Sequence, residues 1–187
     1  MKRMADSGDC FDSALEKAQE YLTQLGMSRN LRPEQKQAIF TLASGKDLLA
    51  VLPTGFGKSL IFQLLVRVRE IQTGGSSTAV VVCPLKSIVQ DQISEARSMG
   101  LRAVALTDVH LEDIENGKYQ LVFASAEEIL SKKFLASLKK ADAPLHQQLC
   151  AIIVNESHTV ETWTGERFVL SLYLNVFLLK VFYIDAL

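Results

Sequence analysis

The first apolar positions of the chain recur at the spacing of an amphipathic helix. Between residues 11 and 25 they lie mostly three or four residues apart, so they share one face of a helix. Gly26 follows this stretch, and glycine often stands just beyond a helix end. Pro33 is suited to the first turn of a second helix, which we expect to end near Gly45. The sequence thus predicts two helices ahead of the first strand.

Beyond residue 46, short apolar runs alternate with helical patterns. The runs are rich in β-branched residues and lie at residues 47–52, 78–83, 102–106, 120–124 and 151–154. The helical stretches lie near residues 59–71, 86–99, 111–114 and 127–140. Buried strands separated by helices are typical of βαβ units, in which a parallel sheet carries helices on both faces. We therefore predict an α/β fold with a mainly parallel sheet.

The final stretch, residues 168–187, departs from this alternation because it is almost continuously apolar. Its length approaches that of a membrane span, yet Asn175, Lys180 and Asp185 interrupt it. A lysine near the middle of a span costs about 3 kcal/mol on insertion. We therefore expect a buried strand or helix, or the end of an incomplete chain, and we expect no membrane partner.

Composition and charge indicate a globular chain with no overall attraction to nucleic acid. The 187 residues suffice for one domain or slightly more, and the net charge is −1. Cys10, Cys83 and Cys150 lie far apart without a CxxC pair, which argues against a disulfide framework and against a zinc site. Residues 1–7 are followed by polar and acidic residues and not by an apolar stretch, so we expect no secretory signal. We expect an intracellular soluble protein, nuclear if its source is eukaryotic, and leave its oligomeric state open.

A glycine-containing loop between the first predicted strand and the third predicted helix has the pattern of a phosphate-binding P-loop. Gly55 and Gly57 allow backbone N–H groups to turn inward, and the helix that follows adds positive partial charge at its N-terminus. Lys58 would reach the outer phosphates and Ser59 would ligate Mg²⁺. The predicted nucleotide-binding residues of this loop are Pro53, Thr54, Gly55, Phe56, Gly57, Lys58 and Ser59.

Two features of the loop depart from the general P-loop pattern. Leu52 stands where the pattern has its first glycine, and Phe56 places a bulky side chain on the loop. The alternative interpretation is a glycine-rich turn followed by a helix with an exposed lysine. The strand–loop–helix context favours the P-loop.

A second polar group follows the strand predicted at residues 151–154. This strand delivers Asn155, Glu156, Ser157 and His158 at its carboxyl end. In P-loop NTPases such a strand presents an acidic residue to the magnesium ion, and a nearby side chain orients the attacking water. Alone, such a group is more often the polar start of a loop, so its weight comes from its place downstream of a P-loop.

Several ordered motifs resemble the first motor domain of a RecQ-like DNA helicase of the DExH-box group. The similarity covers about residues 25–167, and its last segment is followed by Trp163 in an aromatic-containing loop. The motifs are residues 31–35, 53–60, 81–92, 124–127 and 155–158. The resemblance implies a RecA-like P-loop NTPase domain at residues 27–167, preceded by a helical extension at 1–26 and followed by a divergent apolar tail at 168–187.

The resemblance also implies a function and its ligands. It implies an ATP-dependent DNA helicase that translocates 3′ to 5′, uses ATP and Mg²⁺, acts on single-stranded DNA or duplex junctions, and serves recombination or repair. Lys58 and Glu156 would be catalytic, and Ser59 and Asn155 would hold the metal. Gln35 offers a carbonyl and an amide to the N6 and N7 edge of adenine, while Arg32 adds a donor or stacks on the base.

The same resemblance assigns DNA contacts to four residues. Lys86 and Ser87 follow a strand end, where short polar groups commonly bind phosphates. Ser125 stands in a second strand-contacting segment, and Trp163 would stack on a base. The alternatives remain open, since Lys86 can be an ordinary solvated lysine and Trp163 a half-buried packing residue. Arg32 and Gln35 can likewise be exposed residues at a helix start.

Three departures from the family pattern lower the expected activity. Asn155 replaces the aspartate and brings no charge to the metal, and Met27 lies near the position of an aromatic residue that stacks on adenine. The later motifs and the second motor domain with its arginine finger are not recognisable, so we expect a truncated helicase. Three functions therefore remain: a helicase motor domain, a catalytically impaired nucleotide- and nucleic-acid-binding module, and a P-loop kinase or GTPase unrelated to DNA. Residues 31–35 and 81–92 argue against the third.

Overall fold

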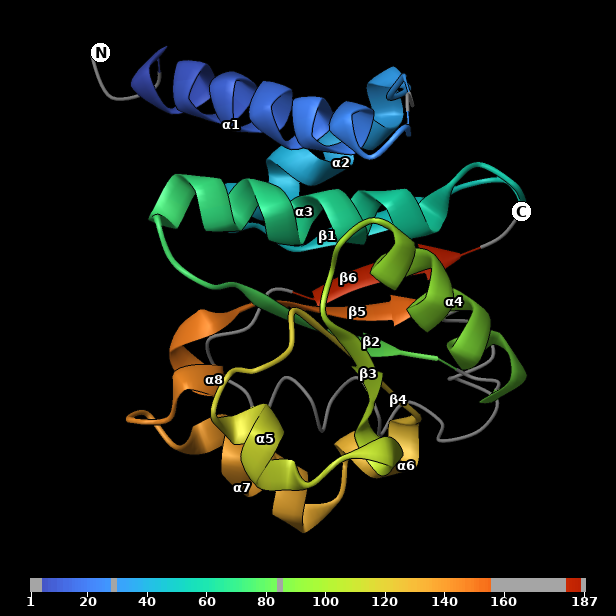
Figure 1. The fold of residues 1–187 in the computed structure, drawn as a ribbon, viewed down its shortest axis with the longest axis vertical. Coiled ribbons are helices and arrows are strands. Elements are labelled where there is room, and N and C mark those ends of the chain that lie inside the picture. Colours follow the sequence, from blue (N-terminus) through green and yellow to red (C-terminus); the bar gives the residue numbers. More distant parts are fainter. Residues whose placement is uncertain (1–4, 28–29, 84–85, 156–180, 186–187) are drawn as a thin grey trace.

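A parallel β-sheet forms the centre of the molecule. The structure, a computed structural model, describes residues 5–27, 30–83, 86–155 and 181–185 (Figure 1). Its six strands have the order β1-β6-β5-β2-β4-β3, and each hydrogen-bonded pair runs parallel. The strands are β1 (Leu48–Val51), β2 (Thr78–Val82), β3 (Ala103–Ala105), β4 (Leu121–Ala124), β5 (Leu149–Asn155) and β6 (Val181–Asp185). The predicted α/β fold with a parallel sheet is confirmed.

Helices cover both faces of this sheet, as Figure 1 shows. The helices are α1 (Ala5–Gln24), α2 (Pro33–Ala43), α3 (Lys58–Thr73), α4 (Lys86–Ser98), α5 (Leu111–Glu115), α6 (Ala126–Ile129), α7 (Lys132–Lys139) and α8 (Pro144–Gln148), with a 3₁₀ turn η1 at Leu106–Asp108. Helices α1 to α4 contribute to one hydrophobic core, and α5 to α8 contribute to the other.

Strand β2 explains why both faces need cover. All of its residues are buried. Ala79 and Val81 pack into the core on the α3 side, whereas Val80 and Val82 pack into the core on the α7 side. Successive side chains of a strand point to opposite faces, so a continuous apolar run requires helices on both.

Helix α1 packs on α3 and contacts α2 through an ion pair. Its buried face includes Phe11 and Leu22, which belong to the same core as α3. Gly26 has a φ of 77° and ends the helix, after which the Met27 N–H donates to the Leu22 carbonyl at 2.9 Å. Lys36 of α2 forms an ion pair with Asp12 of α1 at 3.0 Å. The predicted helices at both positions are confirmed, and α1 begins earlier than the apolar spacing indicated.

The helix predicted at residues 127–140 is two helices in the structure. Ser131 separates α6 from α7, and its hydroxyl accepts a hydrogen bond from the Phe134 N–H at 3.3 Å. A serine at this position satisfies an otherwise unpaired donor of the first turn and so starts a new helix. The prediction of one continuous helix was therefore wrong. Helix α8 and the 3₁₀ turn were not predicted.

Part of the apolar tail forms a strand inside the sheet. β6 lies between β1 and β5, with Phe182 opposite Leu48 and Ile184 opposite Asn155. Of the alternatives left open for residues 168–187, a strand is therefore found at residues 181–185. The helices of the described residues include none with both the length and the apolar character needed to span a bilayer. The proposed domain limits at residues 26 and 167 remain predictions.

Candidate nucleotide and nucleic-acid site

The predicted site segments meet at one edge of the sheet. The P-loop follows β1, the polar group at Asn155 ends β5, and the two predicted DNA-contacting segments follow β2 and β4. Because all the strands run parallel, their carboxyl ends lie along the same edge (Figure 1). Ligands of open α/β sheets bind outside this edge. The fold therefore places these four segments where one ligand-binding surface is expected.

The loop between β1 and α3 is a tight turn with two left-handed glycines. Gly55 has a φ of 76° and Gly57 a φ of 81°, a region that residues with a Cβ rarely adopt. The Phe56 N–H donates to the Pro53 carbonyl at 3.1 Å, which closes the turn. A Cβ added at Gly55 would meet nothing within 4 Å, so space remains beside this backbone. The loop can thus accept a group close to its N–H donors.

Helix α3 begins directly after this loop. Gly57 is its N-cap, and no side chain caps the first turn. Lys58 and Ser59 are the first two helical residues and both are half-buried. An uncapped helix N-terminus that follows a glycine turn favours an anion such as a phosphate group. The loop at residues 53–57 and the first turn of α3 together form a phosphate cradle, which fits a nucleoside triphosphate.

Residues 31–35, the motif predicted to bind adenine, contact the P-loop directly. Gln35 is only 3% exposed, and its Nε2 donates to the carbonyls of Phe56 at 2.9 Å and Gly57 at 3.2 Å. Its Oε1 accepts from the Arg32 N–H at 2.9 Å. The Arg32 guanidinium lies over the Phe56 ring, 4.4 Å from its centre. Both ends of the Gln35 amide therefore bind protein backbone in this structure, an arrangement that the sequence did not indicate.

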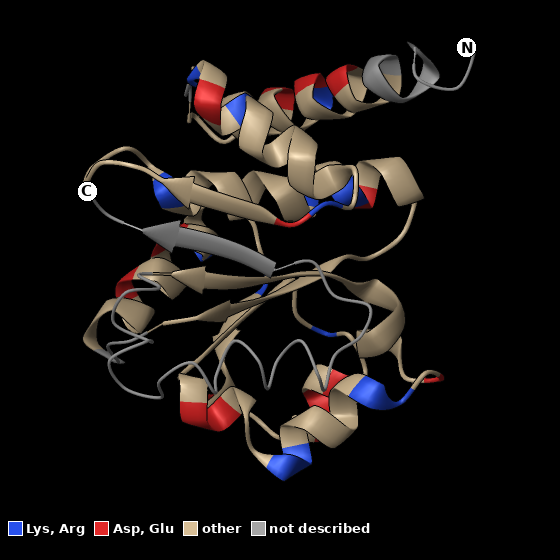
Figure 2. Ribbon diagram, turned by 180° about the vertical axis from the view of Figure 1, so that it is seen from behind, with Lys and Arg blue, Asp and Glu red and all other residues tan. Residues whose placement is uncertain are grey.

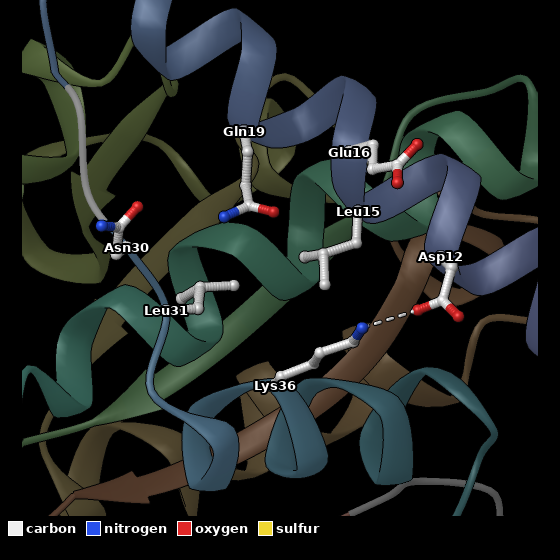
Figure 3. Close-up of a pocket in the computed structure, with 7 residues that line it drawn as sticks. All are labelled: Asp12, Leu15, Glu16, Gln19, Asn30, Leu31 and Lys36. Carbon is white, nitrogen blue, oxygen red and sulfur yellow. Dashed lines mark ion pairs between the residues drawn. The ribbon is translucent and has the colours of Figure 1, made fainter.

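A cavity lies behind this motif, between α1 and residues 30–36. Its volume is about 480 Å³, and the Asp12–Lys36 ion pair crosses one side of it (Figure 3). Leu15 and Gln19 line it from α1, and Leu31 lines it from the opposite segment (Figure 3). No residue of the P-loop lines the cavity, so it is separate from the phosphate cradle.

Asn155 lies at the end of β5 on the side of α3. It is 7% exposed, and it follows Ile153 in the alternation that faces the α3 core. One strand, β6, separates β5 from β1, which corresponds to about 10 Å between the two strands. Asn155 thus lies at the same edge of the sheet as the P-loop, but it offers an amide oxygen where a carboxylate is the usual magnesium ligand. Glu156, Ser157 and His158 lie outside the described residues.

The described part of the chain holds no cluster of three or more His, Cys, Asp or Glu side chains that could bind a metal. The residues of the P-loop fit the phosphates of a nucleotide, and the oxygen atoms that Ser59 and Asn155 offer to its metal ion are both uncharged. When bound, Mg²⁺ neutralises phosphate charge. Ser59 and Asn155 are the residues that would hold it.

Three of the predicted DNA-contacting residues, Lys86, Ser87 and Ser125, lie at the strand-end edge. Lys86 begins α4 beyond β2, and Ser87 beside it is exposed. Ser125 follows β4 and caps α6: its hydroxyl accepts from the Glu128 N–H at 3.3 Å, and its own N–H donates to the Glu128 carboxylate at 2.8 Å. Ser125 thus has a structural role in addition to the predicted contact. Trp163 lies outside the described residues.

Charges of both signs are spread over the described helices, as Figure 2 shows. Acidic residues flank this edge, including Glu127 and Glu128 in the first turn of α6. A nucleic acid would therefore be held by local groups and not by a basic face.

A buried thiol lies beside the segment that follows β2. Cys83 is 2% exposed, and its Sγ donates to the Gln92 carboxamide oxygen at 3.7 Å. Burial raises the pKa of this thiol to about 12. The group therefore stays protonated and unreactive at neutral pH.

Comparison with known proteins identifies the family. The sequence model of the DEAD/DEAH box helicases matches residues 32–177, which is most of the chain. The chain belongs to this family. The matched segment contains Arg32 and Gln35 of the motif at residues 31–35, the P-loop, and residues 155–158.

Several relatives of this DEAD/DEAH box protein are RecQ-family helicases. The chain is 32% identical to the ATP-dependent helicase SGS1 of Saccharomyces cerevisiae over 142 residues, 71% of this chain and 10% of that protein. It is 26% identical to the ATP-dependent DNA helicase RecQ of Bacillus subtilis over 158 residues, 80% of this chain and 25% of that protein. The predicted resemblance to the first motor domain of RecQ-like helicases is confirmed. The chain spans a tenth to a quarter of the length of these two relatives.

A solved structure supports the fold independently. The DUF1998 helicase MrfA bound to DNA superposes with a TM-score of 0.69 at 20% identity, covering 91% of this chain and 26% of that one. This similarity agrees with the RecA-like fold that the resemblance implied.

Proposed function

We propose that this chain is the ATP- and DNA-binding first motor domain of a RecQ-like, ATP-dependent DNA helicase. The proposal includes ATP and Mg²⁺ as ligands and DNA as the partner. The observation that carries it is the P-loop cradle at the end of β1, with Gln35 bonded to its backbone. The family match across residues 32–177 adds to it.

In this proposal different residues bind the phosphates and the base of the nucleotide. The backbone around Gly55 and Gly57 and the start of α3 bind the phosphates, and Lys58 interacts with the outer ones. Arg32, whose guanidinium lies over the Phe56 ring of the loop, contacts the base in this proposal. Ser87 and Ser125 stand at the ends of neighbouring strands, where backbone phosphates of DNA can be bound.

A second candidate is a module that binds nucleotide and DNA without efficient hydrolysis. Asn155 favours it, because an amide at this buried position brings no negative charge to the metal ion. For the chain in isolation this candidate fits the residues better. As part of a complete motor the helicase function fits better, since a second domain would add an arginine finger.

Binding and turnover measured on the same protein separate these candidates. Binding of a fluorescent, non-hydrolysable ATP analogue to the full chain is followed with Mg²⁺ present, and Lys58→Ala serves as the control for the P-loop. We expect saturable binding that Lys58→Ala weakens at least tenfold, because a charged contact to phosphate is lost. Hydrolysis is then measured with and without single-stranded DNA. Hydrolysis that DNA stimulates supports the motor, and binding without turnover supports the module. Absence of analogue binding would rule out both.

A further inference from the structure

The bulky side chain of the P-loop contacts an arginine from the motif that precedes it in the sequence. The Arg32 guanidinium carbon lies 4.4 Å from the centre of the Phe56 ring. Phe56 is half-buried and packs against the α3 core, while Arg32 is exposed. A guanidinium at this distance is attracted to the face of an aromatic ring. The ring therefore holds an exposed cation beside the phosphate cradle.

Hydrogen bonds fix the backbone on both sides of this contact. The Arg32 N–H donates to Gln35 Oε1, and Gln35 Nε2 donates to the carbonyl of Phe56 itself. The Phe56 N–H closes the turn onto Pro53. One buried amide thus links the backbone of Arg32 to the backbone of Phe56. The side chains of Arg32 and Phe56 therefore start from backbone positions that are already fixed relative to each other.

We propose that Phe56 is a positioning residue for the nucleotide base. It holds the Arg32 guanidinium flat against its ring, so that the opposite face of the guanidinium forms a platform on which the base stacks. A guanidinium is planar and stacks on aromatic groups, which suits it to lie between two rings. The inference rests on the proposed function, because it assumes that the P-loop binds the phosphates of the same nucleotide. It assigns a role to the residue that made this P-loop unusual.

If the proposal is correct, Phe56 contributes to binding of the base and not to binding of the phosphates. The affinities of ATP and of inorganic tripolyphosphate are measured by calorimetry with the full chain and Mg²⁺. We expect Phe56→Ala to weaken ATP binding about three- to tenfold, the range of a partly exposed cation–π contact, and to leave tripolyphosphate binding unchanged. Phe56→Tyr keeps the ring and should retain the ATP affinity.

Two further variants test whether the ring acts through Arg32. Phe56→Leu preserves apolar packing without an aromatic face, so it should lose ATP affinity as the alanine variant does. Arg32→Ala should weaken ATP binding to a similar degree, and the double variant should be no weaker than Arg32→Ala alone. Thermal unfolding of each variant shows that the loss does not come from unfolding.

The outcomes distinguish this inference from the proposed function. If Phe56→Ala weakens ATP and tripolyphosphate equally, or if Phe56→Leu binds ATP as tightly as the native chain, Phe56 only shapes the loop and the positioning role is wrong. If the native chain binds neither ligand, the proposed function itself is wrong. If it binds both and Phe56→Ala changes neither affinity, the proposed function stands and this inference alone fails.

Discussion

Substitution of Gly57 by alanine should destabilise the protein more than the same substitution at Gly55. Both glycines have a left-handed backbone, with φ values of 81° and 76°. A Cβ at Gly55 would meet no atom within 4 Å, whereas a Cβ at Gly57 would lie 2.9 Å from Gln35 Nε2. The pair thus separates the penalty of backbone conformation from the penalty of a steric clash.

The expected magnitudes follow from these contacts. The left-handed conformation costs an alanine about 1–2 kcal/mol, so Gly55→Ala should lower the free energy of unfolding by that amount. At Gly57 the buried Gln35 amide must also move and lose its bonds to the carbonyls of Phe56 and Gly57. Each such bond contributes about 1 kcal/mol. Gly57→Ala should therefore cost about 2–4 kcal/mol in total.

Urea unfolding followed by circular dichroism measures both losses. A second background tests the cause, because Gln35→Ala removes the atom with which the new Cβ would clash. In that background Gly57→Ala should cost no more than Gly55→Ala. Equal costs of the two glycine variants in the native chain would refute the reasoning. A larger cost of Gly57→Ala than of Gly55→Ala that persists in the Gln35→Ala background would also refute it.

Three other predictions follow from the described residues. Asn155→Asp should raise Mg²⁺-dependent ATP hydrolysis, since a carboxylate near a divalent ion adds several kcal/mol of attraction at the metal; equal rates with and without the substitution would contradict this. The pKa of Cys83 is raised from 9.0 to about 12, so the neutral thiol stabilises the fold below pH 9 and that stabilisation is lost as the pH rises from 9 toward 12. Alkaline unfolding of Cys83→Ala should start at higher pH than that of the native chain, and a thiol reagent at pH 8 should label exposed Cys10 but not Cys83. Ser131→Ala should cost about 1 kcal/mol in urea unfolding, because α7 loses its N-terminal cap; Ser131→Asp should preserve stability.

The alternation of apolar runs and helical stretches was enough to predict the parallel sheet, because each run has the composition of a buried strand. It was not enough to predict the break at Ser131, since that break depends on one hydroxyl bonded to the Phe134 N–H. Apolar residues on both sides of Ser131 continue the helical spacing, so periodicity alone joins the two helices. Local hydrogen bonding outweighed the pattern here.

In the candidate site too, residues of a local motif could be predicted from the sequence, whereas contacts between distant residues could not. Residues with a fixed local spacing, such as Gly55 to Ser59, could be predicted from the sequence because phosphate binding by such a loop requires them in that order. The contact between Arg32 and Phe56 joins residues far apart in the chain, and no spacing rule indicates it. The burial of the Gln35 amide against the loop depends on how α2 packs on α3, which is likewise a tertiary feature.

The apolar tail matters most for how the site is assembled. Among the described strands, β1 pairs with β6, and β6 in turn pairs with β5. The P-loop at the end of β1 is therefore positioned relative to Asn155 at the end of β5 through residues 181–185. Those residues belong to the apolar stretch for which the sequence left a buried strand and a helix open and disfavoured a membrane span. The pairing with β1 and β5 resolves that ambiguity, since a strand between two parallel neighbours has both edges hydrogen-bonded and needs apolar side chains on both faces. The separation between the phosphate cradle and Asn155, the predicted metal ligand, is thus set by a strand that lies beyond the predicted end of the motor domain.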